Sequence, residues 1–216
     1  MTITIREPGS AITHFIGMML AICASAPLLI KAALNFGEAG IFAMAVFMTS
    51  MVLLYGASTL YHSVNLSGRS LKIFRKIDHM MIFVLIAGSY TPVCLLVLEP
   101  QAGQTLLVAV WAIAAVGMVV KALWITCPKW FSSILYIAMG WACLSVFGQL
   151  MTRLSAPAFF WLLAGGILYT VGGVIYALKL PVFNQLHKNF GSHEIFHLFV
   201  MGGSICHFIC MYQYVL

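Results

Sequence analysis

The chain has 216 residues, of which 62% are hydrophobic and 7% are charged. An ordinary globular domain carries roughly 25% charged residues, so this composition excludes a water-soluble fold and indicates an integral membrane protein. The formal net charge of +6 results from eleven basic and five acidic residues, and the basic residues lie mainly in short segments between apolar runs. Such residues are typical of topology signals facing anionic lipid, and nucleic acid is not an expected partner.

The predicted elements are apolar runs of about 18 to 23 residues, each long enough to cross the hydrocarbon core of a bilayer as a helix. Seven spans are expected, at residues 12–34, 40–62, 79–98, 105–125, 131–151, 158–178 and 195–215. Segments containing proline, glycine and polar residues separate these runs. The sequence therefore predicts an all-α integral membrane protein, a seven-transmembrane helix bundle that forms a single domain over residues 1–216.

Lysine and arginine are distributed unevenly between alternate connections. One side of the membrane receives Arg6, Arg69, Lys72, Arg75, Lys76, Lys121, Lys129, Lys179 and Lys188, whereas the other receives Lys31 and Arg153. Cytoplasmic loops carry the excess of positive charge in membrane proteins. The first side is therefore expected to be cytoplasmic, with the amino terminus inside and the carboxyl terminus outside.

Two patterns within the spans predict details of helix packing. In the third span Pro92 follows Thr91, and a kink is expected there because proline removes one backbone donor and clashes with the preceding turn. The sixth span repeats the pattern Gly-Gly-x-x-Tyr at residues 165–169 and 172–176. This repeat places paired glycines on one helix face, which favours close contact with a neighbouring helix.

Two histidines open the seventh span four residues apart, His193 and His197. At this spacing their Cβ atoms lie about 5 to 6 Å apart on one helix face, which suits two imidazoles binding one metal ion. The alternative is a helix start with polar residues at the headgroup level. Residues 193–197 read His-Glu-Ile-Phe-His and so have the letters of the His-Glu-x-x-His motif. Glu194 is about 100° further around the helix and is expected to point elsewhere, so it is not assigned the catalytic role of that motif's glutamate.

The orientation, which depends on lysine and arginine alone, places further ionisable residues on the same side as this pair. His62 ends the second span there, and Asp78 begins the third. Ionisable residues inside a membrane are costly and usually mark function. With His193 and His197, His62 completes an open tris-imidazole site whose fourth position is left to water, the arrangement that zinc uses for hydrolysis. For His62 taken alone, a structural hydrogen bond is the alternative.

Two further polar residues are candidates for catalysis. Ser58 lies one turn deeper than His62 on the same face and can hydrogen-bond the water or a substrate carbonyl; the alternative is a bond to its own helix backbone. Asp78 is the only aspartate in the sequence. It can orient a ligand histidine, or hold the water and accept its proton; the alternatives are a helix cap or an ion pair with Arg75 or Lys76.

The remaining histidines are not assigned to this metal site. His14 begins the first span on the same side and its role is left open, and His79 and His187 are expected at the membrane interface. His207 lies about 15 Å along the helix from His197, which is too far to join the same ion.

These residues fall in three ordered blocks with familiar spacing. The blocks are Glu7 to Thr13-His14, with Ser10 where asparagine is common; Ser58-x-x-x-His62, continuing to Asp78-His79; and His193-x-x-x-His197. With them, the sequence resembles the progestin and adipoQ receptor / haemolysin III family of seven-span membrane proteins. Without the long amino-terminal domain of the animal receptors, the chain is similar to the bacterial haemolysin III type.

The resemblance implies Zn²⁺ on His62, His193 and His197, with Ser58 and Asp78 around its water on the cytoplasmic side. For the wider family it implies hydrolysis of lipid amides of the ceramide type. For bacterial members it implies haemolysis, membrane energetics or lipid homeostasis. It also implies a multi-pass protein of the cell membrane, the inner membrane of a bacterium, with membrane lipids and a lipid-like substrate or ligand as partners.

Three functions are compatible with these residues. The leading hypothesis is a zinc-dependent intramembrane hydrolase that acts on a lipid amide or ester carbonyl. The second is a zinc-stabilised receptor or regulator of membrane lipid or energy homeostasis, in which the metal ties the second and seventh helices together. The third is a pore-forming haemolysin, which the sequence supports poorly because no span carries a regular polar stripe.

Overall fold

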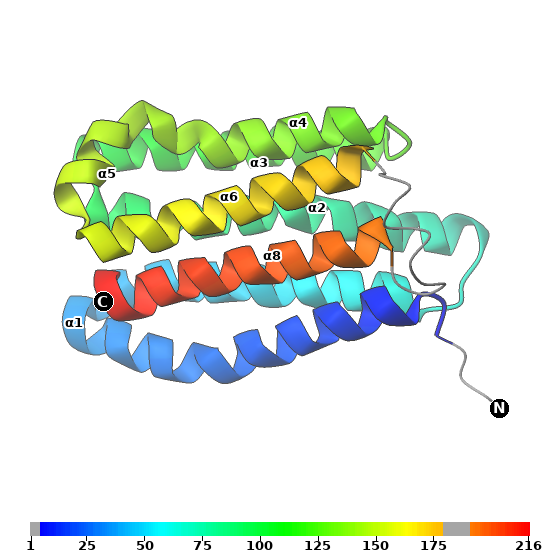
Figure 1. Cartoon of the computed structure of the whole chain (residues 1–216), viewed down its shortest axis with the longest axis horizontal. Helices are drawn as coiled ribbons and strands as arrows, with labels where there is room; N and C mark the ends of the chain where they lie inside the picture. The colour runs from blue at the N-terminus through cyan, green and yellow to red at the C-terminus, as the bar shows by residue number, and fades with distance from the viewer. Residues whose placement is uncertain (1–4, 179–190) are drawn as a thin grey trace.

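The computed structural model describes residues 5–178 and 191–216. Within these ranges the chain is helical and contains no strand, and six helices are long and apolar enough to cross a membrane. Figure 1 shows them running side by side as a bundle. The all-α, multi-pass membrane architecture is confirmed. The predicted positions of Lys179, His187 and Lys188 lie outside the described residues.

The helices follow one another through short connections. Their bounds are α1 Pro8–Ser63, α2 Gly68–Pro92, the π-helical turn η1 Val93–Val97, α3 Pro100–Leu123, α4 Lys129–Gly140, the 3₁₀ segment η2 Trp141–Val146, α5 Phe147–Arg153, α6 Ala156–Leu178, α8 Ser192–Ile209 and the π-helical turn η3 Cys210–Val215. The π-helical turn η1 begins directly after Pro92, where the sequence predicts a helix irregularity.

The first helix, α1, is a hairpin of two arms. Its 56 residues would measure about 84 Å if straight, far more than the ~30 Å hydrocarbon core. Gly37 interrupts it with φ 56° and ψ −140°, a backbone conformation that glycine adopts because it has no Cβ. The chain turns back there (Figure 1), so that the Glu7 backbone N–H donates to the His62 carbonyl at 3.0 Å. The arms before and after Gly37 contain the first two predicted spans.

The predicted span 131–151 corresponds to α4, η2 and α5, which together run from Lys129 to Arg153. The 3₁₀ segment in its middle leaves backbone groups that need other partners. The Tyr90 hydroxyl from α2 supplies them, because it donates to the Gly140 carbonyl at 2.6 Å and accepts from the Cys143 backbone N–H at 2.9 Å. A side chain of α2 thus stabilises the interruption.

Helices α6 and α8 approach closely at the glycine repeat. A Cβ atom at Gly165 would lie 2.3 Å from His207 Cδ2, and one at Gly172 would lie 2.8 Å from Phe199 Cβ. At Gly166, in contrast, no such atom lies within 4 Å. The first glycine of each pair therefore permits the contact, which confirms the predicted packing role of the repeat.

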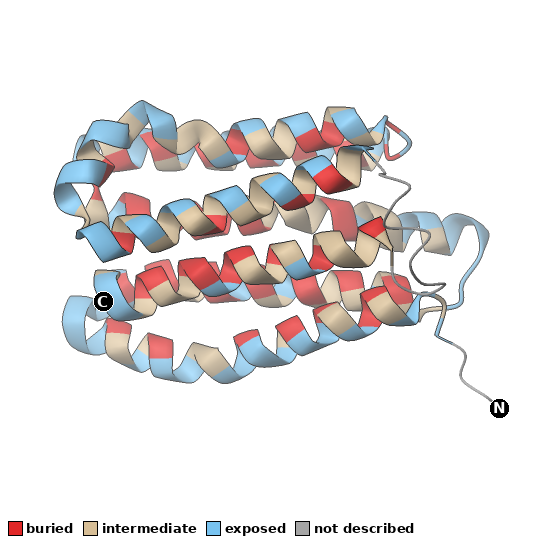
Figure 2. Ribbon diagram, viewed as in Figure 1, coloured by how far each residue is buried: buried red, intermediate tan, exposed pale blue. Residues whose placement is uncertain are grey.

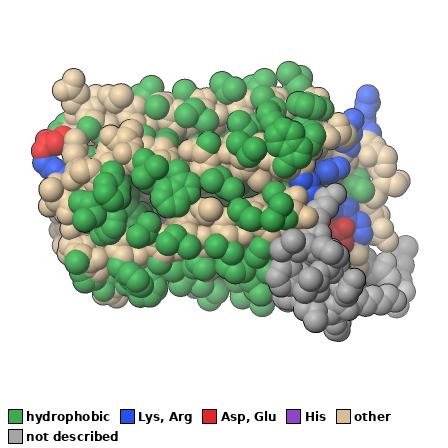
Figure 3. Space-filling model, turned by 45° about the horizontal axis from the view of Figure 1, so that its top comes forward, with side chains coloured by type: hydrophobic (Ala, Val, Ile, Leu, Met, Phe, Trp, Pro, Cys, Tyr) green, Lys and Arg blue, Asp and Glu red, His purple; other side chains and the backbone are tan. Residues whose placement is uncertain are grey.

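The outer surface of the bundle is apolar. Buried residues face the interior, and exposed positions follow the outer sides of the helices (Figure 2), where large apolar side chains such as Leu34 and Leu123 are exposed. In the face shown in Figure 3, hydrophobic side chains cover the middle and charged side chains lie toward the two ends. This distribution is that of a bundle surrounded by lipid.

Candidate metal centre

Three histidines meet at one end of the bundle. His62 comes from the last turn of α1, and His193 and His197 come from the first turns of α8. One ring nitrogen from each lies within 4.8 Å of the others, and the Nε2 atoms of His62 and His193 are 3.2 Å apart. His62 and His197 are fully buried. The structure thus brings together the three residues that the sequence proposes as ligands, in a cluster that can hold a metal ion.

Glu7 holds the far side of the His62 ring. The Nδ1–H of His62 donates to the Glu7 carboxylate, and Arg6 donates to the same oxygen at 3.2 Å. The hydrogen bond with His62 lowers the pKa of Glu7 from 4.5 to about 2, so that the carboxylate is ionised at neutral pH. A proton on Nδ1 leaves the Nε2 lone pair of His62 free to face the cluster, as in the carboxylate–histidine pairs of metal sites.

The first arm of α1 also orients His197. The Nδ1 atom of this ring lies 3.2 Å from the Ser10 backbone carbonyl and 3.3 Å from the Thr13 hydroxyl oxygen. A carbonyl accepts only from an N–H, so this contact places the proton on Nδ1 and leaves Nε2 available to a metal. Two of the three rings are therefore fixed through Nδ1 by the amino-terminal segment.

Glu194 points away from the cluster, as expected. Its carboxylate accepts from the Ser10 hydroxyl at 2.6 Å and from the Gly191 backbone N–H at 2.8 Å. The second bond caps the start of α8, and the first joins α8 to the first arm of α1. Glu194 thus positions the helix that carries His193 and His197.

Ser58 lies one turn deeper than His62, and its surroundings distinguish the two interpretations of the sequence. The side chain is buried at 1% exposure, and its hydroxyl has no hydrogen-bond partner within the described ranges. It does not bond its own helix backbone. The hydroxyl is therefore available to a molecule in the cavity described below, because a buried hydroxyl without a partner is unfavourable.

Asp78 is buried and pairs with its neighbour on α2. Its Oδ2 atom lies 3.2 Å from His79 Nδ1. In the described part of the chain the ion pairs with Arg75 or Lys76 are not formed, and Lys76 instead donates to the Ala122 carbonyl. His79, expected at the membrane interface, is 9% exposed and faces the interior of the bundle, because Tyr136 and Tyr176 pack over it, with Tyr136 donating to its carbonyl at 3.0 Å.

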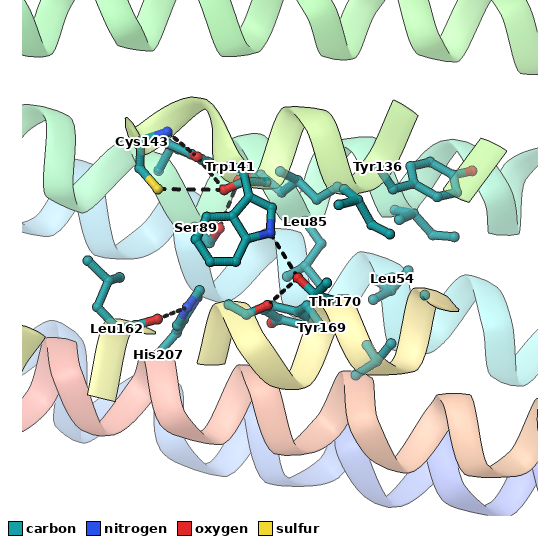
Figure 4. A pocket seen from close by; sticks show the side chains of 18 of the residues that line it. Leu54, Leu85, Ser89, Tyr136, Trp141, Cys143, Leu162, Tyr169, Thr170 and His207 are labelled. Atoms are coloured by element: carbon teal, nitrogen blue, oxygen red, sulfur yellow. Dashed lines mark hydrogen bonds between the residues drawn. The ribbon is translucent and has the colours of Figure 1, made fainter. Parts of the chain in front are cut away.

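These polar residues share one cavity of about 180 Å³ in the interior of the bundle. His14, Ser58, Asp78, His193 and His197 line its polar end. Figure 4 shows the rest of its wall, where Leu54, Leu85 and Leu162 are among the labelled residues and His207 bonds the Leu162 carbonyl at 3.2 Å. The histidine cluster therefore opens onto a largely apolar chamber.

The cavity reaches the lipid-facing surface between η2 and α6. Leu144 of η2 and Leu163 of α6 both line it, and they are 57% and 37% exposed. Trp141 bridges the same two elements, since its indole N–H donates to the Thr170 hydroxyl at 2.9 Å (Figure 4). Figure 3 shows a hollow near the middle of an apolar face of the bundle. An apolar molecule can therefore reach the interior from the side.

The sequence alone did not assign a role to His14. Its side chain is 3% exposed, lines the cavity and stacks on His197 with ring centroids 3.6 Å apart and planes within 8°. The available signal was its position at the start of the first span, on the same membrane side as the other histidines. That signal did not show which groups it would meet.

Comparison with known proteins places these residues in a family. The chain matches the family described as "Haemolysin-III related" over residues 3–208. It belongs to the haemolysin III-related family. The resemblance inferred from the three motif blocks is thereby confirmed, and the match includes all three histidines of the cluster.

Two relatives of this haemolysin III-related protein are similar over almost their whole length. Hemolysin-3 of Bacillus cereus is 39% identical over 211 residues, which cover 98% of this chain and 92% of the relative. The Hemolysin-3 homolog of Bacillus subtilis (strain 168) is 41% identical over 213 residues, with 98% and 95% covered. A more distant relative, the Adiponectin receptor protein of Drosophila melanogaster, is 22% identical over 225 residues, with 94% and 49% covered.

Proposed function

We propose that this haemolysin III-related protein is a zinc-dependent hydrolase that cleaves a lipid amide or ester from the cytoplasmic side of the cell membrane. The observation that carries this proposal is the position of the three-histidine cluster, which lies with Ser58 and Asp78 at one end of an apolar, laterally open cavity. A purely structural metal site has no need of a chamber beside it.

Zinc fits the donor set. Imidazole nitrogen is a preferred zinc ligand, and catalytic zinc sites commonly use three protein ligands and keep one position open. The bonds from Glu7 to His62 and from Ser10 to His197 hold two rings with Nε2 toward the cluster. When bound, the ion polarises a carbonyl group and lowers the pKa of water to near neutrality.

The chain's own residues have separate tasks in the proposed reaction. The Ser58 hydroxyl donates a hydrogen bond to the carbonyl oxygen of the lipid. The Asp78 carboxylate, held by His79, accepts a proton from the attacking water and transfers it to the leaving amine or alcohol. Water is consumed, the bond between the carbonyl carbon and the amine nitrogen or ester oxygen breaks, and a fatty acid is released.

Substrate entry from the bilayer is supported by the wall of the cavity. Leu144 and Leu163 are exposed to lipid and also line the interior. An acyl chain that passes between η2 and α6 exchanges one apolar environment for another, so its entry carries little desolvation cost. Its polar end then meets the polar end of the cavity.

The proposal includes the membrane topology. If the two arms of α1 are counted separately, the six apolar helices correspond to the seven spans that the sequence predicts. The charge asymmetry of the sequence supports a cytoplasmic position for the end with Lys121 and Lys129, and with it for the histidine cluster. The amino terminus is inside and the carboxyl terminus outside, in the cytoplasmic membrane of a bacterium.

A regulatory role is the second candidate, and two observations favour it. The cluster joins α1 to α8, so a bound metal would stabilise their contact, and a distant relative carries the name Adiponectin receptor protein. A pore is disfavoured, despite the names of the Bacillus relatives, because the cavity wall is largely apolar and an aqueous channel requires polar lining.

One experiment separates the two candidates. The purified protein is loaded with zinc and incubated with a panel of lipid amides and esters, and fatty-acid release is measured with and without a chelator. Zinc-dependent release supports the hydrolase. A folded, zinc-loaded protein that releases no fatty acid from the panel supports the regulator.

A further inference from the structure

Buried polar atoms without partners are concentrated on the wall of the cavity. Eight residues in the described ranges carry such atoms, and six of them line this cavity. The six are His14, Ser58, His79, Ser133, His193 and His207; the His79 atom is Nδ1, which lies 3.2 Å from Asp78 Oδ2 as an ion-pair contact without hydrogen-bond geometry. An isolated unpaired polar group is unfavourable in a protein interior. The concentration of such groups on this wall therefore indicates that they form hydrogen bonds with a bound molecule or with water in the cavity.

His14 is unusual within this group because both of its ring nitrogens lack a partner. The ring is 3% exposed and is held on two sides: it stacks on His197, and it meets the Tyr55 ring edge-on with centroids 5.0 Å apart. Its position is therefore fixed by packing, while its hydrogen-bonding capacity is unused.

The stacking geometry excludes His14 as a fourth metal ligand. An imidazole nitrogen directs its lone pair in the plane of its ring. The His14 and His197 rings are stacked with centroids 3.6 Å apart and planes within 8°, so their lone pairs lie in nearly parallel planes and would not converge on one metal ion. His14 would therefore be available to a different molecule in the cavity that it lines.

His14 and Ser58 occupy equivalent positions relative to the cluster. Ser58 lies one turn deeper than the ligand His62, and His14 lies one turn deeper than Ser10, whose carbonyl holds the ligand His197. One helical turn is about 5.4 Å. The two unpaired side chains thus approach the cavity from the two arms of α1, about one turn deeper than the ligand histidines.

We propose that His14 and Ser58 together form the binding site for the carbonyl or carboxylate oxygen of the lipid, each donating one hydrogen bond. The inference deepens the proposed function, on which it rests, because it names the substrate atom that these residues hold. A neutral imidazole carries one N–H donor and can act as an electrophilic donor to a carbonyl oxygen. Donors fixed in a site shielded from water stabilise developing negative charge more than they do in water.

Binding of a fatty acid, the product of the proposed reaction, tests the site without relying on turnover. The dissociation constant of palmitate is measured for zinc-saturated wild type and for His14→Phe, which keeps an aromatic ring against His197 but has no N–H. The alkane of the same length is the control ligand, because it fills the chamber without an oxygen atom. Zinc per chain is measured in every sample, and affinities are compared at equal occupancy.

The expected result is a rise of roughly ten- to a hundredfold in the dissociation constant of palmitate for His14→Phe, the range for loss of a hydrogen bond to a charged group. Affinity for the alkane should not change. His14→Asn and His14→Gln place an amide donor near the positions of Nδ1 and Nε2 respectively, so partial recovery by one of them identifies the donating nitrogen.

Three outcomes would contradict the proposed binding site. They are no palmitate binding by zinc-loaded wild type, equal palmitate affinity in wild type and His14→Phe, or an equal loss of affinity for palmitate and for the alkane in His14→Phe. The last would show that the ring acts by packing alone. Hydrolysis by the wild type is assayed separately. His14-dependent palmitate binding without hydrolysis would reject the enzyme and retain the binding site.

Discussion

The Nε2 atoms of His62 and His193 lie 3.2 Å apart, although 131 residues separate them in the chain. The bond from His62 Nδ1–H to Glu7 leaves a lone pair on His62 Nε2, and this lone pair points into a group of three imidazoles. A neutral His193 that carries its proton on Nε2 can donate it to this lone pair, and a metal ion can replace that proton. The arrangement is therefore that of a cluster that can hold a metal ion.

Removing any one ligand should release the metal. We expect His62→Ala, His193→Ala and His197→Ala each to hold well under one zinc ion per chain, because zinc sites in proteins generally require at least three protein ligands. His207→Ala is the matched control, since His207 lies about 15 Å along α8 from His197 and should leave the zinc content unchanged. Elemental analysis of the purified variants makes the comparison. Full zinc retention by a variant would remove that histidine from the site.

Glu7 should set the strength of metal binding rather than its presence. Glu7→Ala removes the acceptor that orients His62, and loss of such an outer partner typically lowers metal affinity by about 10- to 100-fold. The zinc dissociation constant is measured by competition with a chelator. Glu99→Ala is the control, because Glu99 pairs with Arg153 and lies far along the chain from the cluster. Equal zinc affinity in Glu7→Ala and wild type would show that the carboxylate does not support His62.

Adjacent glycines on α6 should respond oppositely to the same substitution. Gly165→Ala places a Cβ 2.3 Å from His207 Cδ2 and 3.0 Å from the Gly203 carbonyl oxygen, and such overpacking typically costs about 1–3 kcal/mol. Gly166→Ala meets no atom within 4 Å and should be neutral or stabilising by up to ~1 kcal/mol, because alanine favours helix. Thermal unfolding of the two variants in detergent provides the measurement. A Gly165→Ala protein as stable as Gly166→Ala would contradict the packing of α6 on α8.

The orientation in the membrane can be read by labelling single cysteines. In a background without the native reactive cysteines, Ser67→Cys should resist an impermeant thiol reagent in intact cells, whereas Ser155→Cys should react. Both positions are exposed and lie in connections between helices, so accessibility depends on the membrane side alone. Permeabilised cells supply the control in which both react. The reverse pattern in intact cells would place the histidine cluster outside.

Much of the fold was predictable because lipid imposes simple rules. Runs of apolar residues locate the spans, and α1 is an example: the sequence predicts one span ending at residue 34 and the next beginning at residue 40, and the chain turns between them at Gly37. The 3₁₀ segment η2 was not predicted, because its stability depends on the Tyr90 hydroxyl from another helix.

The candidate site was also predictable only in part from the sequence. His193 and His197 were predictable from local spacing, and His62 from the membrane side on which its span ends. The contacts of Glu7, Ser10 and His14 were not, because they depend on how the first arm of α1 packs against α8, and pairs such as Ser10 and Glu194 are separated by 184 residues. The burial of His79 was not predictable either, because it depends on Tyr136 of α4 and Tyr176 of α6.

The central claim is catalysis, and fatty-acid release by three zinc-loaded proteins tests it most directly: wild type, Asp78→Asn and Ser58→Ala. Asp78→Asn keeps the size of the side chain but removes the charge that accepts a proton, so its turnover should fall by about 10² to 10⁴ while zinc content and thermal stability stay near wild type. Ser58→Ala should reduce turnover less than Asp78→Asn does, since it removes only one hydrogen bond. Zinc-dependent release by the wild type with this order of losses is the predicted result. No release by well-folded, zinc-loaded wild type, or unchanged release by Asp78→Asn, would contradict the account.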